Sequence, residues 1–117
     1  MLAVLLLNAA IAVVSGASCL VGLVRPRLAL PAGELPSAGS MFFLGAYAAR
    51  ALPLSLVTLT VLAVGSTAAI VPLLVVSGAA QLWDAALGAR QRNWPMAVTC
   101  VGLAAVHLAT AAWLPFH

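Results

Sequence analysis

Three ionisable side chains, Arg50, Asp84 and His107, lie within long apolar stretches of this chain. An ionisable group near the centre of a membrane helix costs on the order of 2.5–3.5 kcal/mol, so such groups pair with one another or serve a function. A carboxylate can act as a general acid or base, a guanidinium can steady an oxyanion, and an imidazole can transfer a second proton. The sequence therefore predicts acid–base chemistry, with Asp84, Arg50 and His107 as the catalytic candidates.

Polar and aromatic neighbours extend this set along the same helical faces. Tyr47 lies three residues before Arg50, and Gln81 lies three residues before Asp84, so each pair shares one face of a helix. Side chains in these positions are suited to orienting a substrate beside the acid. The predicted substrate-binding residues are Tyr47, Gln81, Asn8 and Trp83.

Other chemistries lack the residues that they require. His107 is the one histidine within an apolar stretch, whereas a haem held between two helices usually takes a pair. Cys19 and Cys100 have no metal-ligand spacing, and the chain has no phosphate-binding glycine loop or nucleophile elbow. We therefore expect no metal, no cofactor and two buried thiols of low reactivity. Five arginines without a lysine are too few for a nucleic-acid-binding surface, so we expect no nucleic-acid partner.

The amino-acid composition indicates whether water or lipid surrounds the folded chain. The chain is 65% apolar and 6% charged, whereas soluble domains carry roughly 25% charged residues. A chain of 117 residues cannot bury so much apolar surface away from water, so lipid must surround it. About 20 apolar residues cross a bilayer as a helix, which pairs its own backbone groups. The sequence predicts an all-α fold, an antiparallel four-helix bundle in the membrane, as a single domain 1–117 with helices at about 2–24, 40–64, 68–88 and 94–114.

Arginines in the connections predict the orientation. Arg25 and Arg27 follow the first helix and Arg90 and Arg92 follow the third, while the second connection has none. The positive-inside rule places both arginine-bearing connections in the cytoplasm and both termini outside. The connection at 65–67 is so short that the helices beside it are expected to form a tight hairpin. The proline- and glycine-rich segment after the first helix is predicted to be a non-helical loop.

The polar side chains are expected at two different depths in the membrane, which we call levels. Arg50 and Asp84 fall in the half of the bundle nearer the arginine-bearing connections, so we expect an ion pair between their helices. Asn8 and His107 fall in the other half and are expected to hydrogen-bond across the bundle. The inward face of the first helix is predicted to continue through Ser15, Ser18 or Cys19, and Gly22.

Four short motifs resemble those of small four-helix DoxX-like membrane proteins of bacteria and fungi. The motifs are Arg25-Pro26-Arg27, Tyr47-Ala-Ala-Arg50, Trp83-Asp84 and His107. The resemblance covers most of the chain and implies a four-helix fold more than one activity, because many of these proteins have no assigned function. The cysteine motifs of redox members are missing, so thiol or quinone chemistry is not implied. The alanine-rich, lysine-free composition is typical of a high-GC bacterium, whose inner membrane is the expected location.

These features predict a membrane-embedded, cofactor-independent enzyme that acts on a lipophilic small molecule from the lipid bilayer. The expected reaction is an acid–base one, such as isomerisation, cyclisation or epoxide opening. Because four helices alone enclose little space, we also expect a homo-oligomer. Two alternatives stay open, in which the same charges serve a small accessory or structural subunit, or a proton-linked transporter. Small multidrug transporters carry a carboxylate in their first helix, where this chain has none.

Overall fold

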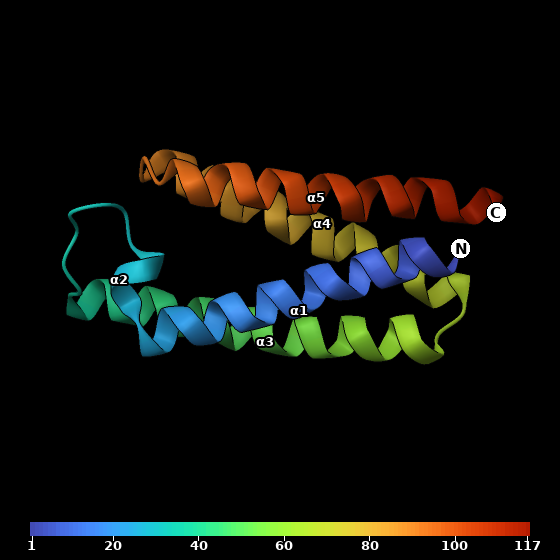
Figure 1. The fold of residues 1–117 in the computed structure, drawn as a ribbon, viewed down its shortest axis with the longest axis horizontal. Helices are drawn as coiled ribbons and strands as arrows, with labels where there is room; N and C mark the ends of the chain where they lie inside the picture. The colour runs from blue at the N-terminus through green and yellow to red at the C-terminus, as the bar shows by residue number, and fades with distance from the viewer.

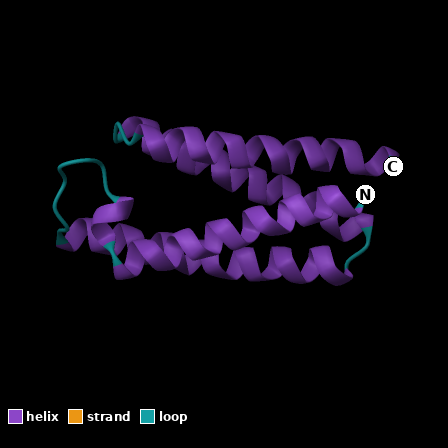
Figure 2. Ribbon diagram, in the orientation of Figure 1, coloured by secondary structure: helices purple, strands orange, loops and turns teal.

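The computed structural model describes all 117 residues, and its regular elements are helices alone (Figure 1, Figure 2). In chain order they are α1 (Leu2–Val24), α2 (Pro26–Ala29), α3 (Ala38–Val64), α4 (Thr67–Arg90), α5 (Trp94–Trp113) and a 3-10 turn, η1 (Leu114–Phe116). The four long helices are each long and apolar enough to cross a membrane. The molecule is 47 Å long, which matches the roughly 40–45 Å of a bilayer with its headgroup regions. The prediction of an all-α, four-helix fold is confirmed, and the chain has the character of a multi-pass membrane protein.

The helices begin and end at residues whose local sequence favours a helix end. The predicted helix bounds agree with the observed ones to within two residues. Helix α3 begins two residues earlier than predicted because Ser37 and Ser40 form a capping box, in which each side chain accepts a hydrogen bond from the other residue's backbone N–H. The loop predicted after α1 was only partly right, since it contains the one-turn helix α2. Pro26 occupies the first position of that turn, where its fixed φ favours a helix and its missing N–H is not needed.

The bundle consists of two helix pairs rather than four equivalent neighbours. Helix α1 packs along α3, and α4 packs along α5 (Figure 1). Small residues allow the closest approach in the second pair: a Cβ atom at Gly88 would lie 3.0 Å from the backbone nitrogen of Ala97. The predicted hairpin of α3 and α4 is antiparallel and has the expected short turn, but these two helices make few contacts with each other. A short connection therefore fixes direction, whereas side-chain packing decides which helices pair.

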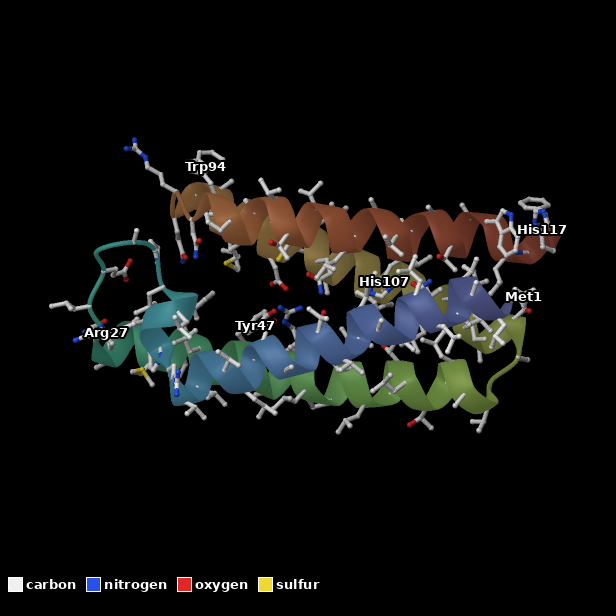
Figure 3. All side chains as sticks on the ribbon, in the orientation of Figure 1. Met1, Arg27, Tyr47, Trp94, His107 and His117 are labelled. Atoms are coloured by element: carbon white, nitrogen blue, oxygen red, sulfur yellow. The ribbon has the colours of Figure 1, made fainter.

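The interface between the pair α1–α3 and the pair α4–α5, called the seam below, contains the buried polar side chains. An apolar cluster closes the seam at the end where both termini lie (Figure 1); its residues are Leu62, Ile70, Leu74, Ala111 and Leu114. Arg27 lies at the opposite end, away from Met1 and His117 (Figure 3). Between these ends the seam is polar, with buried Asn8, Ser15, Thr58, Ser77, Gln81, Asp84, His107 and Thr110. Large apolar side chains instead cover the outside of the molecule, as lipid exposure requires.

Candidate functional site

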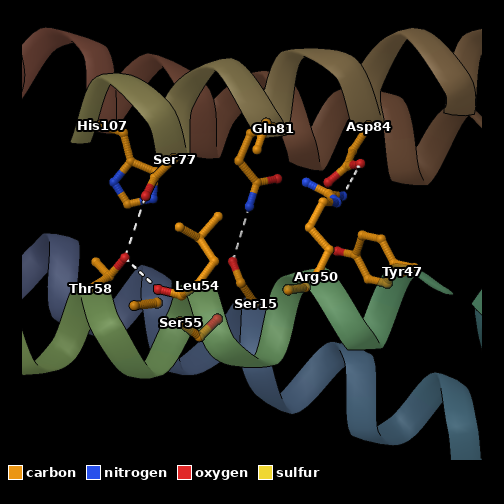
Figure 4. A pocket seen from close by; sticks show the side chains of 13 residues that line it. Ser15, Tyr47, Arg50, Leu54, Ser55, Thr58, Ser77, Gln81, Asp84 and His107 are labelled. Atoms are coloured by element: carbon orange, nitrogen blue, oxygen red, sulfur yellow. Dashed lines mark hydrogen bonds and ion pairs between the residues drawn. The ribbon is translucent and has the colours of Figure 1, made fainter. Parts of the chain in front are cut away.

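An ion pair joins the two helix pairs in the half of the bundle nearer α2. Nη2 of Arg50 on α3 donates to Oδ1 of Asp84 on α4 at 2.6 Å (Figure 4). The predicted pairing is confirmed. The two partners differ in environment, because the Arg50 side chain is 43% exposed and that of Asp84 only 5%. The second carboxylate oxygen, Oδ2, has no hydrogen-bond partner in the protein, so it is free to exchange a proton with a bound molecule.

Tyr47 supports the guanidinium from the same helix. Its ring centroid lies 5.4 Å from Cζ of Arg50, within the distance at which a cation is attracted to the face of an aromatic ring. This contact is the one expected from their spacing of three residues along α3. The ring therefore helps to hold the Arg50 head at the level of Asp84.

Gln81 lies one turn from Asp84 on the same face of α4 and is 8% exposed. Its Nε2 donates to Oγ of Ser15 on α1 at 3.1 Å. Its Oε1 is the one side-chain nitrogen or oxygen atom that is fully enclosed by the protein and has no hydrogen-bond partner. Buried polar atoms of native proteins are nearly always paired, so an unpaired one indicates a place where a ligand or water binds.

Asn8 and His107 meet in the other half of the bundle, and here every amide atom has a partner. Nδ2 of Asn8 donates to the Val4 carbonyl at 2.9 Å and to Oγ1 of Thr110 at 2.8 Å. Oδ1 of Asn8 lies 2.7 Å from Nδ1 of His107. The predicted hydrogen bond between Asn8 and His107 is confirmed.

These contacts determine which ring nitrogen of His107 carries the proton. The Val4 carbonyl can only accept, so the amide nitrogen of Asn8 must face it and the amide oxygen must face the imidazole. That oxygen can only accept, so Nδ1 of His107 is the donor. In the neutral ring, Nε2 is then the proton acceptor, and no protein group hydrogen-bonds to it.

A small polar cavity connects the two levels. Its volume is about 30 Å³, which is enough for ordered water between several polar groups. Asp84 and Arg50 line one end and His107 the other, with Gln81 between them (Figure 4). The hydroxyl groups along its wall belong to Ser15, Tyr47, Ser55, Thr58 and Ser77. A carboxylate and an imidazole therefore share one polar space inside a membrane protein.

A second, much larger cavity lies between α1 and α5 and has a volume of about 520 Å³. This volume is typical of sites for small organic ligands. Its wall includes the outward-facing side chains Val14, Val21 and Leu28, so the cavity opens toward the surface that lipid covers. It shares three lining residues with the small cavity: Ser15, Tyr47 and Gln81. An apolar space with access from lipid thus adjoins the polar space that holds Asp84.

Five of the seven predicted site residues line the small cavity: Arg50, Asp84, His107, Tyr47 and Gln81. Asn8 does not, because its amide is fully used in holding His107 and Thr110. Trp83 lines neither cavity and is 73% exposed on the outside of the bundle, so the structure does not bring it together with these residues. Adjacent residues of a helix point about 100° apart, so a neighbour of the inward-facing Asp84 points outward. On α1, Cys19 rather than Ser18 continues the buried face.

Sequence reasoning missed much of the lining of both cavities. Thr58 lies eight residues after Arg50, so an extension of the same helical stripe would have found its hydroxyl. On the α5 wall of the large cavity, Pro95, Met96 and Cys100 carry no such signal because they are apolar. A cavity between helices depends on how far the helices stand apart, which periodicity does not specify.

No group of three or more potential metal ligands is brought together by the fold. The two cysteines are buried and unpaired. Comparison with protein-family models, curated proteins and solved structures finds no match to this chain.

Proposed function

We propose that this protein is a membrane-embedded enzyme that converts a lipophilic small molecule by cofactor-independent acid–base chemistry. The observation that carries the proposal is the junction of the two cavities. A lipid-accessible apolar cavity meets a polar one in which a buried carboxylate has one oxygen without a partner. Apolar binding volume next to a few convergent polar groups is the usual arrangement of a site for a small organic molecule.

The reaction requires only a proton moved within one substrate. Oδ2 of Asp84 removes a proton from one atom of the substrate, and the same proton returns to another atom, so that no co-reactant is consumed. Arg50 keeps the carboxylate in place through Oδ1 and offers its remaining N–H groups to an oxygen that gains negative charge. Nε2 of His107 is available as a second proton acceptor across the small cavity. Isomerisation and cyclisation fit this scheme, and so does epoxide opening in which the nucleophile belongs to the same molecule.

A structural role is the second candidate, and one observation favours it. Helices α3 and α4 make few contacts, yet the ion pair between Arg50 and Asp84 connects them. In this account the pair is a clamp that orients the two helix pairs in an accessory subunit. A clamp does not by itself require the large cavity, which is why we place it second.

The proposed setting is the inner membrane of a bacterium, with the arginine-bearing connections in the cytoplasm and both termini outside. Arg25 and Arg27 lie in the first of these connections, and Arg90 and Arg92 lie at the second. The positive-inside rule supports this orientation. We also propose a homo-oligomer, in which a second copy covers exposed apolar side chains away from the opening of the large cavity.

The proposal is tested by comparing the small molecules of source cells that carry the wild type, Asp84→Asn or Trp83→Phe. Cells and medium are profiled separately, and the amount of folded protein is measured in each strain. We expect Asp84→Asn to replace one compound by its isomer, whereas Trp83→Phe, a change on the lipid-facing side of α4, leaves the profile unchanged. The same compound moved from medium to cells would indicate transport instead. Unchanged profiles with normal protein levels would leave the structural role.

A further inference from the structure

The large cavity has chemical features that restrict what can bind in it. We propose that it takes an uncharged lipophile with a single hydrogen-bonding group, which binds with that group inward against the Gln81 amide. The inference rests on the proposed function, because it names the class of substrate for the same site. It is argued from three features of the cavity wall.

The first feature is the absence of charge. None of the 18 lining residues is an arginine, lysine, aspartate, glutamate or histidine. A charged ligand would lose its hydration on entry and find no opposite charge, which strongly disfavours its binding. The ligand is therefore neutral, and apolar side chains such as Leu28, Phe43 and Leu103 contact its body.

The second feature is the number of polar groups that are still free. Ser18 donates its hydroxyl to the Val14 carbonyl, and Asn93 donates to the Ala29 carbonyl at 3.3 Å. Ser15 is already bonded to Gln81, whose Oε1 has no partner. The hydroxyls of Tyr47 and Thr99 and the amide oxygen of Asn93 have no hydrogen bond either, but they are less enclosed. The fully enclosed polar atom without a partner belongs to Gln81, at the boundary of the two cavities.

The third feature is the chemistry of the amide itself. Whichever end of the Gln81 amide meets the Ser15 hydroxyl, the other end stays without a partner. An alcohol can satisfy either end, because its hydroxyl both donates and accepts, whereas a ketone or epoxide oxygen can pair only with an amide nitrogen that faces the cavity. Burial makes this hydrogen bond worth more than on the surface. Gln81 lies one turn from Asp84, so this contact brings the polar end of the ligand to the carboxylate. Recognition and reaction would then involve the same end of the molecule.

Photolabelling tests the inference on the whole protein in lipid nanodiscs. The probe is 1-decanol carrying a diazirine in its chain, and labelled peptides are identified by mass spectrometry. We expect labels on the cavity-lining segment of α5, from Met96 to Leu103. Unlabelled 1-decanol should compete about tenfold better than decane or decanoate, as expected for one buried hydrogen bond. The preference over decane should vanish in Gln81→Leu and persist in Trp83→Leu, a matched change on the outside of the same helix. The preference over decanoate should persist in both variants, because the cavity wall stays uncharged.

Three results would overturn the inference. Labels confined to lipid-facing side chains would show that the cavity does not bind the probe. Equal competition by decane would remove the role of the Gln81 amide, and stronger competition by decanoate would contradict an uncharged ligand. Photolabelling measures binding and not turnover. An unchanged small-molecule profile in the Asp84→Asn strain would therefore contradict the proposed function but not this inference, and failed photolabelling would contradict this inference but not the proposed function.

Discussion

The two polar levels of the bundle are built from similar side chains but differ in how completely they are satisfied. In the level near the termini, Asn8 uses both ends of its amide, and Thr110 and His107 are its partners. In the level near α2, one oxygen of Asp84 and one atom of Gln81 have no partner in the protein. The small cavity reaches both levels and meets His107 at the first, whereas the large cavity adjoins the second level alone. An apolar cluster packs beyond the first level.

This difference separates polar groups that hold the bundle together from polar groups that are available to another molecule. A satisfied buried network rigidifies the fold and fixes how its helices meet. An unsatisfied group costs stability, so its presence next to a cavity indicates that binding supplies the missing partner. Substitutions in each level test this difference, and their expected losses of stability range from large to small.

Removing Arg50 should have the largest effect. Arg50→Leu leaves the Asp84 carboxylate, which is 5% exposed, as a buried charge without a partner. We expect a loss of about 3–5 kcal/mol in the free energy of unfolding. Asp84→Asn should cost much less, because the Arg50 head is 43% exposed and can turn toward water or lipid headgroups. Unfolding by sodium dodecyl sulfate, followed by circular dichroism, compares the two variants; equal losses would contradict the asymmetry.

Removing Asn8 should have an intermediate effect. Asn8→Leu keeps the branched shape of the side chain but leaves Nδ1 of His107 and the hydroxyl of Thr110 without their partner. We expect a loss of about 1–3 kcal/mol in the same unfolding measurement. The imidazole nitrogen signals of ¹⁵N-labelled protein should also change from a single Nδ1–H tautomer to a mixture. The measurement is made in a His117→Gln background, so that His107 gives the only histidine signals. An Nε2–H tautomer of His107 in the protein with Asn8 intact would contradict the hydrogen bond from Nδ1 of His107 to Asn8.

Removing the Gln81 amide should have the smallest effect on stability. Gln81→Leu eliminates the buried atom that has no partner, and the Ser15 hydroxyl that it releases can bond to a carbonyl of its own helix. We expect the free energy of unfolding to stay within about 1 kcal/mol of the wild type. Ser15→Ala serves as the control for loss of the single hydrogen bond between them. A large loss of stability in Gln81→Leu would show that the inner level is structural as well.

Most of the fold could be predicted because lipid imposes strict requirements on helices. Uninterrupted apolar stretches marked the four spans, and depth along each span was enough to pair Arg50 with Asp84 and Asn8 with His107. Which helices pack tightly could not be predicted, since small residues such as Gly88 decide this through contacts distant in the sequence. The same reason hid the large cavity and the place of Cys100 in its wall. Trp83 lies outside both cavities because a residue next to the inward-facing Asp84 on a helix can point outward.

The central claim is that Arg50 and Asp84 perform chemistry rather than only join helices. The most direct test is the double variant Arg50→Gln/Asp84→Asn, which removes both charges and leaves neither without its partner. We expect its free energy of unfolding to return to within about 1 kcal/mol of the wild type, while the profile of small molecules stays that of the Asp84→Asn strain. A double variant that regains both stability and the wild-type profile would contradict the claim and establish the pair as a clamp.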